Sequence, residues 1–327
     1  MNELQNAVKE KAAELLTNGA AARVMGWRKG EFIHDPEPAS FSEVTELKDF
    51  VYDDYCGANL SKYLIAESKK VGVTAVFLKP CDTLSFNQLL KEHRIDREKT
   101  RVIGVECAGK LDEYKIAAKG ITCVTAERYE GDKVIFECAD GEVTVDKAEV
   151  LLEKCLSCKG KKFAVADETV VLHEMPDTVN DRFSKVKELE AMTADERYAF
   201  WQGELSKCIR CNACRNVCPA CSCVKCVFDN PASGIAAKAN DVPFEEQLFH
   251  IIRAFHVAGR CTDCGECSRV CPQRIPLHLL NRKFIKDINV LYGDYQAGEE
   301  SEGRTPLTSF TEHDVEPNAA LDKAEGK

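Results

Sequence analysis

Two cysteine runs of identical spacing limit what this chain can fold into more than any other feature. The first run extends from Cys208 to Pro219 and the second from Cys261 to Pro272, and both follow the pattern Cys-x-x-Cys-x-x-Cys-x-x-x-Cys-Pro. Three thiolates separated by two residues each surround one iron–sulfur cube, whereas the fourth cysteine points away and ligates the other cube. The proline prevents the turn from continuing. The repeat therefore predicts two [4Fe–4S] clusters.

The spacing predicts a crossed set of ligands, in which each run gives three cysteines to one cluster and its last cysteine to the other. The predicted sets are Cys208, Cys211, Cys214 and Cys271 for one cluster, and Cys261, Cys264, Cys267 and Cys218 for the other. Structural zinc, which also uses four thiolates, is the alternative. Zinc would leave the third cysteine of each run and both prolines without a role, so the pattern favours iron.

The cysteine content also bears on location, because the chain has 18 cysteines in 327 residues. A chain of this size needs no disulfides to fold, so dense cysteines indicate metal in a reducing compartment. The first residues, MNELQNAVKEKAAELL, lack the unbroken apolar run of an export signal. The longest uncharged apolar stretch, Val71 to Leu78, is far shorter than a membrane span. We therefore expect a cytoplasmic protein without membrane insertion.

The formal net charge of -10 is distributed unevenly. Residues 294–327 contain nine acidic and three basic side chains, so this segment carries -6 and leaves -4 for the rest of the chain. A nearly balanced body offers no broad basic face, and we expect no nucleic-acid partner. The acidic segment is poor in apolar residues, which predicts a disordered tail.

Residues 1–190 are expected to form one α/β or α+β domain. Residues 73–78 and 101–106 are apolar and predict strands, and residues 82–90 predict a helix between them. A strand, a helix and a second strand over this length form a βαβ unit, which implies a parallel sheet. Residues 133–145 predict a hairpin. The predicted fold class is therefore a domain with a partly parallel sheet, followed by a helical domain.

Residues 191–293 are expected to form a mainly α-helical, ferredoxin-like domain. Thr193 and Glu196 have the spacing of a capping box and predict the start of a helix. Residues 231–241 are interpreted as a loop, and residues 244–258 predict a second helix. Because this helix separates the two cysteine runs, the module differs from a compact β-type ferredoxin.

The helix predicted over residues 244–258 is amphipathic. Its inward face is predicted to consist of Leu248, Ile251, Ile252 and Phe255. Its two histidines, His250 and His256, lie on different faces, and we interpret them as packing or surface residues. No grouping of Ser, His and Asp in the sequence indicates hydrolytic chemistry.

Several cysteines outside the repeat form a weaker pattern. Cys155 and Cys158 are a lone Cys-x-x-Cys pair, and Cys81 and Cys107 follow the two predicted parallel strands, where open α/β sheets bind ligands. One interpretation is a third cluster. The alternatives are free thiols and a zinc site. That zinc site would consist of Cys155, Cys158, Cys223 and Cys226, of which the last two follow Cys221 closely.

Three short segments carry a resemblance to a known family. They are Leu78-Lys-Pro-Cys-Asp82, Arg101-Val-Ile-Gly-Val-Glu-Cys107-Ala-Gly, and Cys155-Leu-Ser-Cys158 with Ala166-Asp167 downstream. These segments resemble the beta-subunit family of coenzyme F420 hydrogenases and dehydrogenases. Residues 208–226 and 261–281 resemble the dicluster module of that family's relatives and of heterodisulfide-reductase-like complexes. The resemblance covers most of residues 50–285.

The resemblance implies a subunit with iron–sulfur clusters and FAD that passes electrons between a soluble carrier and a partner enzyme. It implies other redox subunits as partners in a larger complex of anaerobic metabolism, and a cluster held by Cys107, Cys155 and Cys158 beside the flavin. The family's paired-cysteine motif is reduced to Cys56-Gly-Ala-Asn59, so Cys56 and Cys81 are both candidates for the fourth ligand. No Gly-x-Gly-x-x-Gly occurs, and Gly26 to Gly30 is either a phosphate-binding turn or a plain surface turn.

Two functions remain open from the sequence. In the first, the protein is a relay subunit of an oxidoreductase, and a partner performs the chemistry. In the second, it is itself a flavin-dependent oxidoreductase, linked to F420 or a nicotinamide, that splits a hydride into single electrons for its clusters. A metal-structured scaffold without electron transfer is a more distant third. We favour the electron-transfer subunit.

Overall fold

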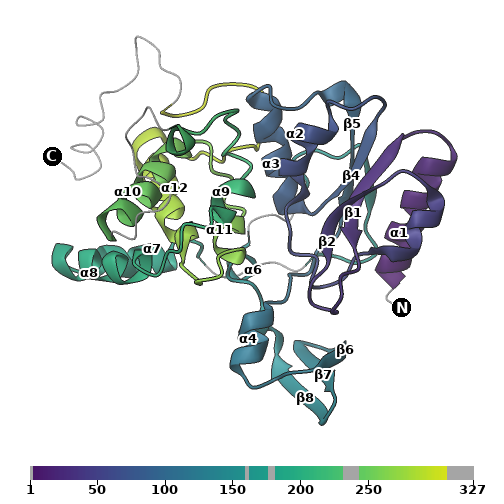
Figure 1. Ribbon diagram of the computed structural model, residues 1–327, viewed down its shortest axis with the longest axis horizontal. Coiled ribbons are helices and arrows are strands. Elements are labelled where there is room, and N and C mark those ends of the chain that lie inside the picture. The colour runs from purple at the N-terminus through teal and green to yellow at the C-terminus, as the bar shows by residue number, and fades with distance from the viewer. Residues whose placement is uncertain (1–2, 159–161, 176–180, 231–242, 308–327) are drawn as a thin grey trace. The chain divides into compact units, whose positions relative to one another are not determined.

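The computed structural model divides the chain into two compact units (Figure 1). It describes residues 3–158, 162–175, 181–230 and 243–307. The units are Met1–Thr83 with Ile95–Asn180, which we call the sheet unit, and Leu84–Arg94 with Asp181–Lys327, which we call the helical unit. The chain first passes from one unit to the other inside a helix, so neither unit is a continuous stretch of sequence.

The sheet unit contains a six-stranded mixed sheet. Its strands are β1 (Arg23–Arg28), β2 (Glu37–Phe41), β3 (Phe50–Val51), β4 (Thr74–Leu78), β5 (Thr100–Val105) and β9 (Glu168–Val170). The order is β2-β1-β4-β5-β9, with β3 paired to β1, and the pairs β1–β4, β4–β5 and β5–β9 are parallel. All residues of β4 are buried, as expected of a parallel strand covered on both faces. The predicted partly parallel sheet is confirmed.

Helices lie on both sides of this sheet (Figure 1). Helix α1 (Glu3–Thr17) is on one side and buries Val8, Ala12 and Leu15, and α2 (Leu64–Glu67) is on the other. Helix α3 (Pro80–Lys91) follows β4 directly and begins earlier than predicted, because proline suits the first helical position. Cys81 therefore lies in the first turn of α3. Short 3₁₀ helices occupy Val44–Asp49, Leu60–Tyr63 and Arg97–Lys99.

A second, three-stranded antiparallel sheet completes the sheet unit. Its strands are β6 (Val124–Glu130), β7 (Lys133–Cys138) and β8 (Gly141–Asp146). Cys138 pairs with Gly141, so the predicted hairpin over residues 133–145 is confirmed. Helices α4 (Glu113–Ala118) and α5 (Lys147–Val150) pack with this sheet around Val134 and Phe136, and α6 (Glu153–Leu156) follows them.

The described part of the helical unit contains helices and loops but no strand, and the end of α3 belongs to it. Its other elements follow in chain order. They are α7 (Ser184–Ala191), α8 (Ala194–Leu205), α9 (Ala213–Asn216), α10 (Pro243–His256), α11 (Glu266–Arg269) and α12 (Leu277–Tyr292), with a 3₁₀ helix at Val227–Asp229. Thr193 and Glu196 form the predicted capping box at the start of α8. Helix α10 packs against α8 and α12, and the short α9 and α11 pack against each other. The predicted helical second domain is confirmed.

Helix α10 presents a different face to the core than the sequence predicts. Ile251 is 43% exposed and Phe255 is 60% exposed, so their predicted inward orientation is wrong. The buried positions are instead Glu246, Phe249, His250, Arg253 and Ala254. Apolar periodicity cannot find this face, because most of the side chains that line it are polar.

The acidic segment after Asp294 is not disordered throughout. Ala297 and Thr305 are buried, and Tyr295 donates from its hydroxyl to the carbonyl oxygen of Gly259 at 3.0 Å. Gly298 has a φ of 78° and lies against the Leu84 carbonyl so closely that a Cβ would collide with it. These small and polar contacts let an acidic stretch pack without a large apolar surface. The rest of the predicted tail, 308–327, and the predicted loop 231–241 lie outside the described residues.

Within the described residues, no helix has the length and apolar character to cross a membrane.

Candidate iron–sulfur centres

The two cysteine runs form the same local structure twice. The second and fourth residues after the first cysteine have positive φ in both runs. These are Arg210 (52°) and Asn212 (61°) in the first run, and Asp263 (58°) and Gly265 (68°) in the second. Non-glycine residues rarely adopt this left-handed backbone, yet three of the four do so at matching positions. The repeat in the sequence is therefore a repeat in backbone shape.

Backbone N–H groups point at the cysteine sulfurs of these loops. At Cys208, the amide of Arg210 donates to Sγ at 3.4 Å. The amide two residues along the chain makes the same bond to three further cysteines, namely Cys218, Cys261 and Cys264. Such bonds stabilise a thiolate, which is the form that binds metal, and they are typical of iron–sulfur loops.

The first predicted ligand set gathers around one small pocket. Its lining includes Cys208, Cys211, Cys214 and Cys271. Cys271 comes from the second run, and it lies beside the three cysteines of the first. Burial raises the pKa of Cys214 above its ordinary value, and the neighbouring Cys271 raises it further. A pocket that converges four sulfurs from two distant segments suits a metal cluster.

The second predicted set gathers around Cys218, the last cysteine of the first run. Burial raises the pKa of Cys261, Cys264 and Cys267, and the charge of Cys218 adds to this effect at all three. The pKa of Cys218 itself is lowered, chiefly by a hydrogen bond with Cys221 and also by Arg253. The structure thus brings Cys218 next to the second run, as it brings Cys271 next to the first.

Four cysteines of the sheet unit also lie together. Cys81 is hydrogen-bonded to Cys158, and this bond and burial raise its pKa. Burial raises the pKa of Cys155, and the charges of Cys107 and Cys158 contribute as well. Cys81 follows strand β4 and Cys107 follows strand β5, whereas Cys155 lies on α6 and Cys158 comes just after it. The group therefore lies at the carboxyl edge of the parallel strands.

A buried lysine adjoins this group. Lys110 is nearly inaccessible, its Nζ donates to the Asp53 carbonyl oxygen at 2.6 Å, and its backbone amide donates to Cys155. Burial alone would lower the pKa of Lys110, but the nearby Cys107 and carboxylates raise it above its ordinary value. Cys56 is fully buried near the same lysine, and its Sγ donates to Asp53 Oδ1 at 3.3 Å. The group of four therefore includes Cys81 and has a fixed cation beside it.

The remaining cysteines of the helical unit are dispersed. Cys221 contacts Cys218, Cys226 contacts Arg215, and Cys223 is exposed. Cys155 and Cys158, the other half of the zinc alternative, already have two cysteine neighbours in their own unit.

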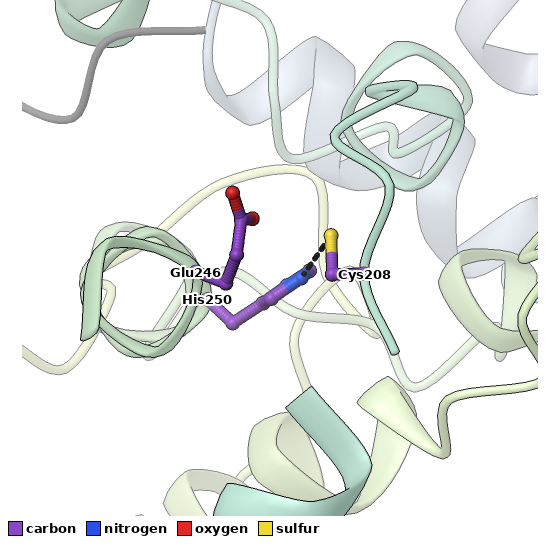
Figure 2. A group of neighbouring side chains, drawn as sticks. All are labelled: Cys208, Glu246 and His250. Carbon is purple, nitrogen blue, oxygen red and sulfur yellow. Dashed lines mark hydrogen bonds between the residues drawn. The ribbon is translucent and has the colours of Figure 1, made fainter. Parts of the chain in front are cut away.

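Glu246 and His250 lie beside Cys208 (Figure 2) and are functional candidates that the cysteine pattern does not predict. His250 lies with its Nε2 3.2 Å from Cys208 Sγ, and Glu246 is close enough that the three ligand atoms lie within 4.8 Å of one another. Burial lowers the pKa of His250 to about 3, so its imidazole is neutral. The interpretation of His250 as a packing or surface residue misses this contact. The sequence does contain a pattern that could have pointed to this contact. Glu246, His250 and Arg253 are spaced so that all three lie on one face of a helix.

A cavity of about 830 Å³ opens on the sheet unit. Its lining includes Lys29 and Gly30, but Trp27 and Arg28 belong to strand β1, so residues 26–30 are not one turn. The other charged side chains of the lining are Glu31, Asp53, Asp54 and Glu127. Burial raises the pKa of Glu127 to about 7, and the two aspartates add to this effect. Asp53 joins the cavity to Lys110 and hence to the cysteine group.

The 4Fe-4S dicluster domain model matches residues 204–275. The F420-dependent formate dehydrogenase subunit beta of Methanocaldococcus jannaschii is 25% identical, over 80% of this chain and 84% of that protein. The F420-dependent formate dehydrogenase 1 subunit beta of Methanococcus maripaludis is 23% identical, over 90% of each chain.

Among solved structures, a chain of the xenon-derivatised F420-reducing [NiFe] hydrogenase complex from Methanosarcina barkeri has a TM-score of 0.38. It is 13% identical, and the match covers 48% of this chain and 59% of that one. A similarity at this level is too slight to support a structural argument.

Proposed function

This chain belongs to the beta-subunit family of coenzyme F420 hydrogenases and dehydrogenases and carries a 4Fe-4S dicluster domain, and we propose that it relays electrons between a soluble carrier and a partner enzyme. It is an iron–sulfur electron-transfer subunit of an oxidoreductase complex. The named relatives are subunits of F420-dependent enzymes, which suggests F420 as the carrier and other redox subunits as partners. Such enzymes would place the protein in anaerobic metabolism, in the cytoplasm.

One observation supports the proposal best. The two cysteine runs have the same left-handed loops, and their amides point at buried sulfurs. A structural zinc site needs neither a matched pair of such loops nor a cysteine exchanged between them. We assign the eight cysteines of the repeat to two [4Fe–4S] clusters in the crossed sets. When bound, such clusters accept and give up single electrons, and the chain's residues hold them and set their potentials.

The cysteine group of the sheet unit extends the proposal to a third cluster. Cys81, Cys107, Cys155 and Cys158 are neighbours within one unit, so a complete ligand set is at hand without Cys56. The amide of Lys110 donates to Cys155, in the manner of the loops described above. Lys110 would offset part of the negative charge of four thiolates. We therefore propose Cys81 as the fourth ligand.

The cavity of the sheet unit favours a second candidate function, that of a flavin-dependent oxidoreductase. A volume of about 830 Å³ accommodates a cofactor or carrier ring. Its lining has four carboxylates and one lysine among the described residues, which suits the N–H groups of a ring better than a diphosphate. Asp53 lines this cavity and accepts a hydrogen bond from Lys110, which adjoins the cysteine group.

The test is to purify the full chain without oxygen and to measure iron, acid-labile sulfide and released flavin per chain. The proposal expects about eight irons from the repeat and about four more from the sheet unit, with matching sulfide. About four irons or fewer in fully folded protein, with zinc in their place, would reject the relay function. Stoichiometric FAD would favour the second candidate, and iron without flavin would favour the relay alone.

A further inference from the structure

Arg253 lies at the centre of the helical unit, on helix α10. It is 2% exposed, and its three guanidinium nitrogens are buried with no carboxylate or carbonyl partner in the part of the chain that the structure describes. Its side chain reaches the sulfur of Cys267, and the thiols of Cys214, Cys218 and Cys221 are also close to it. His250 on the same helix is a further neighbour. No acidic side chain balances this arginine among the described residues.

The other buried arginines of this unit have carboxylate partners. Arg210 pairs with Glu246 at 3.5 Å, and Arg282 pairs with Asp263 at 2.9 Å. Arg260, which is partly buried, pairs with Glu92 at 2.5 Å. A buried cation without such a partner is strongly destabilising. The negative charge that balances Arg253 must therefore come from the cysteines, which means from thiolates bound to metal.

The neighbours of Arg253 come from both ligand sets. Cys214 belongs to the first set, and Cys218 and Cys267 belong to the second. The Arg253 side chain is hydrogen-bonded to Cys267. The sulfurs of Cys214 and Cys218 are close enough to interact with the same guanidinium. One positive charge therefore acts on sulfurs of both sets at once.

We propose that Arg253 is a positioning residue that serves as the shared counter-charge of the two clusters and raises the reduction potential of both. The inference rests on the proposed function, since it needs clusters at the two sets. Reduction adds one electron to a cluster that is already negatively charged through its four thiolates. A fixed cation stabilises the reduced form more than the oxidised form. Arg253 also screens the repulsion between two reduced clusters.

The test is a redox titration of the anaerobically purified full chain with dithionite as reductant, monitored by electron paramagnetic resonance. Arg253→Gln removes the charge, and we expect both midpoint potentials to shift negative. A tenfold loss in each reduction equilibrium constant, about 59 mV for one electron, is the expected scale. Arg253→Lys keeps the charge, and its potentials should remain near those of the wild type. Lys187→Gln removes an exposed positive charge from the same unit, which water and salt screen. This variant is the control and should shift neither cluster by a comparable amount.

Each outcome decides the matter. Unchanged potentials in Arg253→Gln with full iron content, or equal shifts in the Gln and Lys variants, would overturn the proposal. If Arg253→Gln fails to retain iron, the iron content of Arg253→Lys decides. Retained iron in the Lys variant supports the need for a positive charge. An equal loss of iron in both variants shows that the shape of the arginine side chain matters instead and overturns the proposal. A wild-type protein without cubane signals would reject the proposed function itself, which separates that failure from a failure of Arg253.

Discussion

Single side chains around the cysteines have the clearest consequences for redox chemistry. His250 contacts the sulfur of Cys208, which belongs to the first ligand set, whereas Arg253 faces both sets. A hydrogen bond to one sulfur and a charge shared by two sets differ in which clusters they affect. The residues beside each cluster can therefore be separated by experiment.

Replacing His250 should affect one cluster only. If Cys208 binds iron as a thiolate, the neutral imidazole donates from Nε2 to its sulfur, and His250→Leu removes that bond. A hydrogen bond of this kind contributes about 1 kcal/mol, which is about 40 mV for one electron. We expect the cluster of Cys208 to shift negative by this amount in a redox titration and the other cluster to stay unchanged. His256→Leu on the same helix, where the side chain is exposed, should change neither, and equal shifts at both clusters would contradict the assignment.

Glu127 should make the stability of the sheet unit depend on pH. Its pKa is about 7 in the folded protein against an ordinary 4.5, because its carboxylate is buried and Oε2 has no partner in the described structure. Between these values the folded protein keeps a proton that the unfolded chain has lost, so stability falls as pH rises through this window. Glu127→Gln should therefore raise the free energy of unfolding at pH 8 by on the order of 2 kcal/mol, and by less at pH 6. The denaturation midpoint at the two pH values measures this difference.

The matched control for this prediction lies on the same strand. Glu130 is exposed on β6, so Glu130→Gln should leave the pH dependence of the midpoint as it is. A Glu127→Gln variant that follows the wild-type pH profile would show that the carboxyl group is not buried in solution.

At the scale of elements, the crossed pairing of the two cysteine runs is the feature to test. Cys271 lies with the first run, so Cys271→Ser should damage the cluster of Cys208, Cys211 and Cys214. Cys264→Ser should damage the other cluster. Electron paramagnetic resonance of the two variants should therefore show the loss of different signals. Loss of the same signal in both variants would mean that each run holds its own cluster.

The elements differ in how well the sequence predicts them. The parallel strands β4 and β5 follow from their apolar composition, and the capping box of α8 follows from Thr193 and Glu196, because these signals are local. The orientation of α10 does not follow, because three of its buried residues, Glu246, His250 and Arg253, are polar and meet groups of the two cysteine runs. The place of Cys81 after a parallel strand is visible in the sequence, but its contact with Cys158 and the hydrogen bond from Cys56 to Asp53 are tertiary contacts that the sequence does not show.

For the whole molecule, the decisive quantity is the total iron content. If Cys81 is the fourth ligand of a third cluster, Cys81→Ser should lower the iron content by about four atoms per chain. Cys56→Ser is the matched control and should keep the full content, because the Sγ of Cys56 is already hydrogen-bonded to Asp53 Oδ1 and to the Val51 carbonyl oxygen. Full-length chains are needed, since α3 begins in the sheet unit and ends in the helical unit. Equal losses in both variants, or a loss in Cys56→Ser alone, would reject Cys81 as the ligand.

Helix α10 also bears on how the protein matures. It turns Glu246, His250 and Arg253 inward and leaves Phe244, Ile251 and Phe255 exposed. The polar side chains of its inward face are stable there only while groups of the two cysteine runs balance them. A chain that has not yet received iron is therefore expected to hold this helix less firmly than the iron-loaded chain does.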